Sequence, residues 1–128
     1  MLSKNKIIAF LATTDAPRSR AFYEGILGLP VASDDPFALV VDAGGTMLRV
    51  QKVQDMKPAP YTALGWEVND IRATAAELVK RNVAFNRYGH FEQDDLGIWT
   101  APSGARVAWF QDPDGNVLSL TQVRGSKA

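Results

Sequence analysis

The segment from Val107 to Gln122 constrains the fold most, because it places a tight turn between two apolar runs. Asp112-Pro113-Asp114-Gly115 has the residue types that a β-turn requires: proline presets φ at the second position, and glycine accepts a positive φ at the fourth. The flanking runs have the composition of β-strands. The segment is therefore predicted to form a β-hairpin, and the residues that it points inward bear directly on function.

The two halves of the chain share one plan. Residues 6–53 and residues 61–122 each read as a strand, a helix capped by an acidic or amide residue, and three further strands. Residues 54–60, with two prolines, read as a linker, and residues 123–128 as a tail. A repeat of about half the chain indicates an internal duplication. Neither half could bury a full core alone, so we expect one α+β domain over residues 1–128.

Composition excludes several functions. Fourteen Lys and Arg residues balance fourteen Asp and Glu residues, so no basic surface for nucleic acid is expected. Cysteine is absent, which excludes a catalytic thiol and cysteine-ligated metal. No apolar run has the length of a membrane span. The apolar run at 7–12 is too short for a signal peptide, so a cytoplasmic protein is expected.

Local signals predict the individual elements. Asp15 is expected to cap the first helix and Gly28 to end it, whereas Asn69 or Asp70 caps the second helix and Asn82 ends it. Residues 89–104 are expected to form a long loop with a short extended piece at 98–100. The apolar stripe predicted for the second helix consists of Ile71, Ala75, Leu78 and Val79. The strands predicted outside the hairpin are 6–14, 30–33, 37–42, 46–53, 61–68 and 83–88.

Three pieces of the sequence, in this order, resemble the glyoxalase / bleomycin resistance / extradiol dioxygenase superfamily, also called vicinal oxygen chelate proteins. The matching pieces run from Thr14 to Pro30, from Trp66 to Ile71, and from Phe110 to Leu120 with its Asp-Pro-Asp-Gly-Asn. The match covers nearly the whole chain. The resemblance implies two βαβββ modules whose strands curl into a cup, ligand binding inside the cup, and a homodimer.

Side chains along each predicted strand alternate between two faces. The apolar face is expected to lie under a helix, and the face with smaller or more polar side chains is expected to line the cup. Trp109 could stack on a flat ligand, and so could Phe10, although core packing is the commoner role of an aromatic side chain. His90 and Trp99 become candidates if the 89–104 loop closes over the cup. The predicted cup wall consists of Phe10, Arg49, Gln51, Glu67, Ser119 and Thr121.

The resemblance also implies four metal-ligand positions, which fall on Ile8, Gln51, Ala63 and Ser119. Ile and Ala have no donor atoms, and an amide and a hydroxyl are weak ligands for a hard divalent ion. No metal and no other cofactor is therefore expected. His90 with the acidic residues 92, 94 and 95 could form a metal cluster, but a solvated polar loop is the simpler interpretation.

Arg49 and Glu67 have two interpretations. They could orient a polar ligand, or they could pair with each other across the cup or at a dimer interface.

The leading hypothesis is a metal-free protein of the bleomycin-resistance type that binds a small organic molecule. One alternative is a glyoxalase-like lyase or isomerase with a noncanonical metal site or with Glu67 as base. A further alternative is a subunit whose site is completed by a partner chain.

Overall fold

The computed structural model describes residues 1–123, and residue contacts divide the chain into two compact units, Met1–Pro58 and Ala59–Ala128. The boundary between the units falls inside the predicted linker 54–60. Most of the predicted tail, residues 124–128, lies outside the described residues. Among the described helices, none is long and apolar enough to cross a membrane.

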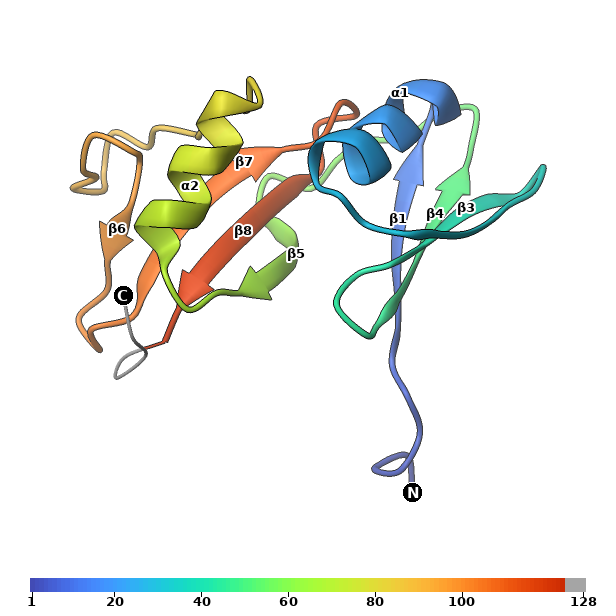
Figure 1. Ribbon diagram of the computed structural model, residues 1–128, viewed down its shortest axis with the longest axis horizontal. Helices are drawn as coiled ribbons and strands as arrows, with labels where there is room; N and C mark the ends of the chain where they lie inside the picture. The colour runs from blue at the N-terminus through green and yellow to red at the C-terminus, as the bar shows by residue number, and fades with distance from the viewer. Residues whose placement is uncertain (124–128) are drawn as a thin grey trace. The chain divides into compact units, whose positions relative to one another are not determined.

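The first unit contains a four-stranded mixed sheet, sheet A, with the strand order β1-β4-β3-β2 (Figure 1). The strands β1 and β4 run parallel, and the other neighbours run antiparallel. The elements are β1 (Ile8–Thr13), α1 (Ala16–Arg20), the π-helical turn η1 (Ala21–Ile26), β2 (Val31–Asp34), β3 (Ala38–Asp42) and β4 (Met47–Lys52).

The first helix begins where the sequence predicts. The Asp15 carboxylate accepts a hydrogen bond from the Arg18 backbone N–H at 3.2 Å, which caps the helix. The helix then widens, because the Leu27 N–H donates to the Phe22 carbonyl five residues back. Gly28 follows with φ of 71° and ends the helix as predicted. The turn η1 buries Phe22 and Tyr23.

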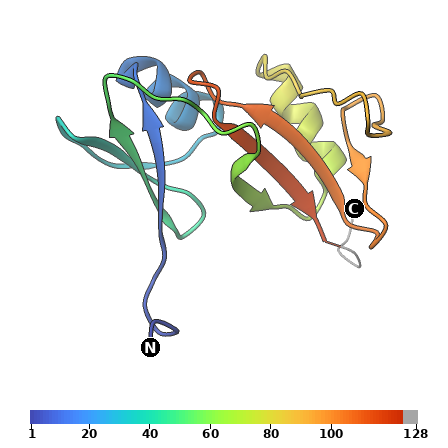
Figure 2. The ribbon, with the colours of Figure 1, turned by 180° about the vertical axis from the view of Figure 1, so that it is seen from behind.

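The second unit contains sheet B, with the strand order β5-β8-β7-β6 and a parallel β5–β8 pair. Its helix packs against β7 and β8 (Figure 1), and Figure 2 shows these two strands from the side that lies away from the helix. The elements are β5 (Thr62–Glu67), α2 (Ile71–Lys80), β6 (Trp99–Thr100), β7 (Arg106–Gln111) and β8 (Val117–Gln122).

Asp70 caps α2 by accepting from the Ala73 N–H at 3.1 Å. A second bond ties this helix start to the sheet, because the buried Gln122 side chain accepts from the Ile71 N–H at 2.9 Å. Asn82 has a positive φ of 68°, so the left-handed helix end predicted there is confirmed.

The predicted hairpin is present. The Gly115 N–H donates to the Asp112 carbonyl at 3.0 Å, and Gly115 has φ of 89°, a value that glycine adopts without strain. The buried Asp112 carboxylate also accepts from the backbone N–H groups of Asp114 and Asn116, each at 2.9 Å. Asn116 returns a side-chain hydrogen bond to Asp112 at 2.8 Å. These bonds satisfy the turn internally and hold β7 and β8 in register.

Each sheet has one face covered by its own helical segment. In sheet A the fully buried residues Leu39, Leu48 and Val50 form this covered face. In sheet B the covered face carries Phe110 and Leu118, which are cross-strand neighbours. The predicted division into an apolar and a more polar face therefore holds in β4, where Arg49 and Gln51 alternate with the buried Leu48 and Val50.

Two local predictions are wrong. Residues 83–88 form no strand, because their backbone groups bond to single partners rather than to a ladder: the Asn86 N–H donates to the Trp109 carbonyl, and the Tyr88 N–H to the Gln93 side chain. The edge of β7 pairs instead with the short β6. Val79 does not join the buried stripe of α2 and is 47% exposed, because it lies one position beyond Leu78 and turns toward solvent.

Candidate functional site

The open face of sheet B, the side away from α2, gathers most of the predicted binding residues. Strand register places Ser119 between Gly65 on β5 and Trp109 on β7. Thr121 lies between Glu67 and Val107, and Val107 in turn pairs with Trp99 on β6. Five predicted residues therefore share one face of one unit: Glu67, Trp99, Trp109, Ser119 and Thr121.

An aromatic cluster covers the β6–β7 side of this face. The Phe91 ring lies nearly parallel to Trp109, with centroids 5.4 Å apart and planes at 9°. The same ring stacks on Trp99 with centroids 4.6 Å apart and planes at 24°. Tyr88 meets both Phe91 and Trp109 edge-on. The cluster presents planar apolar surface beside hydroxyl and carboxylate groups, a combination that suits an organic ligand with a ring system.

Two contacts with β5 shape the floor of this face. The Trp109 indole N–H donates to the Thr62 hydroxyl at 3.1 Å, which orients the ring. A Cβ atom added at Gly65 would lie 2.5 Å from Ser119 Oγ, closer than real atoms approach. Glycine is therefore required at position 65 for Ser119 to keep its side-chain position.

The loop that carries Phe91 is clamped at its base. The Gln93 side-chain amide donates to the carbonyls of Asn86 and Gly97, each at 2.9 Å, and its oxygen accepts from the Tyr88 N–H. The Asp94 carboxylate accepts from the N–H groups of Leu96 and Ile98, each at 2.9 Å. The long loop predicted at 89–104 is thus held by hydrogen bonds at its base, and its role over a ligand stays a prediction.

Two arginines complete this clamp. Arg72 on α2 lies 2.7 Å from Asp94 Oδ2 and 3.3 Å from Asp95 Oδ1. Hydrogen bonding to Arg72 lowers the pKa of the exposed Asp95 carboxyl. Arg87 donates to the carbonyls of both aspartates. Asp94 and Asp95 therefore act in the structure of the loop.

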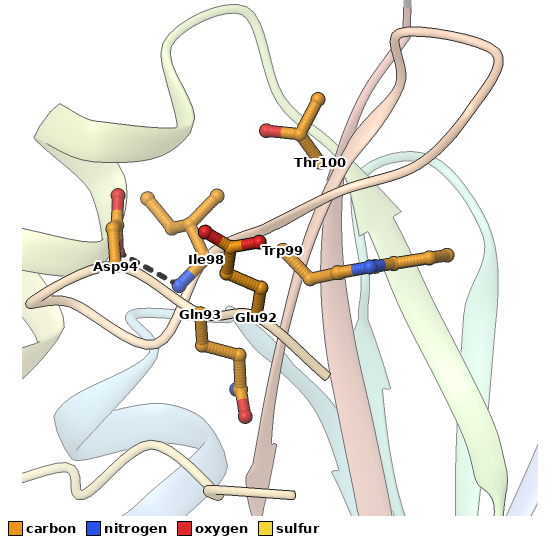
Figure 3. Close-up of a pocket in the computed structure, with 6 residues that line it drawn as sticks. All are labelled: Glu92, Gln93, Asp94, Ile98, Trp99 and Thr100. Atoms are coloured by element: carbon orange, nitrogen blue, oxygen red, sulfur yellow. Dashed lines mark hydrogen bonds between the residues drawn. The ribbon is translucent and has the colours of Figure 1, made fainter. Parts of the chain in front are cut away.

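A pocket of about 450 Å³ lies beside the loop, at the edge of sheet B. Figure 3 shows that the Trp99 indole points away from the other lining side chains. The carboxylate of Asp94 on its wall already bonds to the Ile98 N–H. The lining residues are Glu92, Gln93, Asp94, Ile98, Trp99 and Thr100.

Of the four remaining predicted residues, His90 lies in the loop before β6, and the other three lie on the open face of sheet A. Phe10 pairs with Arg49 across β1 and β4, and Gln51 follows two positions along β4. Phe10 is 54% exposed, so it does not serve as a core residue of its unit. Within the first unit, Arg49 forms no ion pair with a described residue, and within the second unit the same holds for Glu67.

The four positions to which the resemblance assigns metal ligands carry weak donor atoms or none. Ile8 and Ala63 carry only hydrocarbon side chains, and both are exposed. Gln51 and Ser119 supply an amide and a hydroxyl. Across residues 1–123, no three His, Asp or Glu side chains are grouped to hold a metal ion. His90 contacts the rings of Tyr88 and Phe91 instead.

Sequence reasoning missed four residues that shape the open face of sheet B: Thr62, Gly65, Tyr88 and Phe91. The signal for the last two was present, since four aromatic or imidazole residues fall between positions 88 and 99. The assignment of 83–88 to a strand separated Tyr88 from the loop and hid the cluster.

A family model described as the Glyoxalase/Bleomycin resistance protein/Dioxygenase superfamily matches residues 7–120. The chain therefore belongs to this superfamily, and both the predicted family and the predicted α+β fold are confirmed. No curated protein matches the sequence significantly.

Solved structures of the same fold include two antibiotic-binding proteins and a bleomycin resistance determinant. An antibiotic binding protein from Streptomyces sp. CB03234, TnmS3, is 25% identical with a TM-score of 0.73, covering 96% of this chain and 98% of that chain. A bleomycin-binding protein complexed with bleomycin is 21% identical with a TM-score of 0.73, covering 93% and 98%. A bleomycin resistance determinant encoded on the transposon Tn5 is 20% identical with a TM-score of 0.74, covering 94% and 99%.

Proposed function

We propose that this protein binds a small organic molecule bearing a planar ring system, and that it holds the molecule without a metal ion. The observation that carries this proposal is the aromatic cluster on the open face of sheet B. The two indoles of Trp99 and Trp109 offer flat surface, while Glu67 and Thr121 lie on the same face as polar partners. The antibiotic-binding structures of the same fold support this class of function.

The chemistry of the family's metal positions supports binding without a metal. Two of the four side chains, those of Ile8 and Ala63, have no lone pair to donate. The reactions of metal-dependent relatives polarise a substrate oxygen at the ion, and this chain lacks the donors to hold such an ion in that place. The proposal therefore assigns sequestration, rather than turnover, to this protein.

The test is a screen of aromatic compounds by quenching of tryptophan fluorescence, because two of the three tryptophans lie on the proposed site. Trp109→Ala should weaken binding on the order of tenfold, since one stacking surface is lost. Trp66→Phe is the matched control: Trp66 lies on the other face of β5, alternating with Gly65 and Glu67, so this change should leave affinity unchanged. A screen without any binder would refute the proposal.

Elemental analysis of the purified protein tests the metal-free part. We expect no stoichiometric metal, and zinc, nickel, manganese or iron bound at one equivalent would favour a lyase or isomerase instead.

We further propose a cytoplasmic homodimer, which light scattering checks through the mass in solution. A strict monomer at high concentration would contradict the dimer.

A further inference from the structure

The tip of the Phe91 loop is held differently from its base. Gln93 and Asp94 clamp the base with hydrogen bonds to residues 86, 88, 96, 97 and 98. Across residues 89–92, by contrast, one backbone bond joins the tip to the rest of the described chain, from the Phe91 N–H to the Tyr88 carbonyl at 3.0 Å. Hydrogen bonds therefore hold the base of the loop more firmly than they hold its tip.

Ring contacts are what hold the tip over the sheet. Phe91 touches Trp99, Trp109 and Tyr88, and its plane follows that of Trp109 to within 9°. His90 beside it and Glu92 after it are both exposed. A single ring thus occupies the surface on which an aromatic ligand would stack.

We propose that Phe91 is a built-in competitor at the ligand face: its ring covers Trp99 and Trp109 and is displaced when an aromatic ligand binds. This inference rests on the proposed function. A ligand ring that replaces Phe91 recovers the same stacking contacts with both indoles, so the exchange costs little beyond moving the four-residue tip. The apparent affinity is then the affinity of the open form multiplied by the fraction of molecules in which the tip is open.

Phe91 could instead help to bind the ligand, and removal of its ring would then change the affinity in the opposite direction. If the ring formed a third wall of the site, its removal would weaken binding. If it competes, its removal should strengthen binding on the order of tenfold, which corresponds to one stacking interaction. One substitution therefore separates the two roles.

The experiment titrates 1-anilinonaphthalene-8-sulfonate, a fluorescent probe with linked aromatic rings, into the wild type, Phe91→Ala, Glu92→Asp and the double variant Phe91→Ala/Trp109→Ala. Glu92→Asp is the matched control, because Glu92 is exposed on the same tip and the change keeps its charge, which matters for an anionic probe. Thermal unfolding of each variant checks that probe binding does not follow from a loosened fold.

We expect about tenfold tighter binding to Phe91→Ala, an unchanged affinity for Glu92→Asp, and loss of the gain in the double variant. Equal or weaker binding to Phe91→Ala overturns the competitor role, and so does a gain that persists without Trp109. Absence of probe binding in every variant overturns it as well. The proposed function is judged separately, because any screened compound that binds the wild type supports it whatever Phe91→Ala does.

Discussion

The open faces of the two sheets follow the same strand plan but carry different chemistry. On sheet A, Phe10 is exposed beside Arg49 and Gln51, and no aromatic side chain stacks on it among the described residues. On sheet B, two indoles lie beneath a ring supplied by a loop. The difference teaches that two sheets with the same strand plan can carry different surfaces, because the segment between α2 and β7 supplies an aromatic ring in the second unit.

The helices of the two modules differ in a related way. The first module widens its helix into η1 and ends it at Gly28, so its chain returns to β2 within a few residues. The second module uses the regular helix α2, whose Arg72 also clamps the Asp94 loop. The second helix therefore contributes to the site, whereas the first covers its sheet.

The largest expected effect tests the floor of sheet B. Gly65→Val should lower the free energy of unfolding by about 2 kcal/mol, because its side chain overlaps Ser119 Oγ. Urea denaturation measures the change. Gly25→Ala in η1 is the control, since nothing lies within 4 Å of its added Cβ, and it should not destabilise the protein. A Gly65→Val protein as stable as the wild type would contradict this close approach.

The next effect separates two adjacent acids in the loop clamp. Asp94→Ala removes the acceptor of two backbone N–H groups and a partner of Arg72, so we expect a loss of about 1–2 kcal/mol. Asp95→Ala removes one exposed ion pair that solvent screens, so it should cost less than Asp94→Ala. Thermal unfolding of both variants gives the comparison, and equal losses would show that the clamp depends on charge alone.

A third prediction concerns Arg49 on the open face of sheet A, which the sequence makes a candidate ligand-binding residue. Arg49→Ala should weaken binding of a screened compound by about fivefold, the value of one hydrogen bond. Its stability should stay within about 0.5 kcal/mol of the wild type, because Arg49 lies on the open face and has no ion pair in its unit. Calorimetric titration gives the affinity. Unfolding of the variant would instead make Arg49 a structural residue.

The smallest expected effect concerns acid stability of the two modules. Lys52 and then Arg20 hydrogen-bond to Asp34 and lower the pKa of its carboxyl below the ordinary value of 3.8. A depressed pKa stabilises the fold above pH 3.8, and this contribution is lost as pH falls through the lower folded value. Asp34→Asn should therefore flatten the acid limb of a plot of stability against pH.

Asp95 in the second module should show the same sign with a smaller change. Arg72 lowers the pKa of its carboxyl, but the side chain is 76% exposed, against 28% for Asp34, so solvent screens the pair more strongly. Asp95→Asn should consequently alter the acid limb less than Asp34→Asn. A larger change of the acid limb for Asp95→Asn than for Asp34→Asn would contradict this order of the two effects.

Much of the fold could be predicted because its signals are local. Asp15 and Asp70 cap their helices through bonds to residues three positions away, and Asp112 closes its turn within four residues. Strand alternation on β4 likewise needs only neighbouring residues. The site was harder, because Ser119, Gly65 and Trp109 come together through pairing of three strands. The ligand role of the predicted residues stays a prediction.

The sequence by itself determined the family, the duplicated plan and the lack of donor atoms at Ile8 and Ala63, since side-chain chemistry needs no coordinates. Only the tertiary structure decided that residues 83–88 leave the ladder and that Phe91 lies on two tryptophans. The physical reason is that β7 pairs with β8 on one edge, and its other edge is taken by the short β6, which lies between residues 83–88 and β7 in the chain. The loop before β6 carries Phe91, and the Phe91 ring covers Trp109 on the open face of the β7–β8 hairpin.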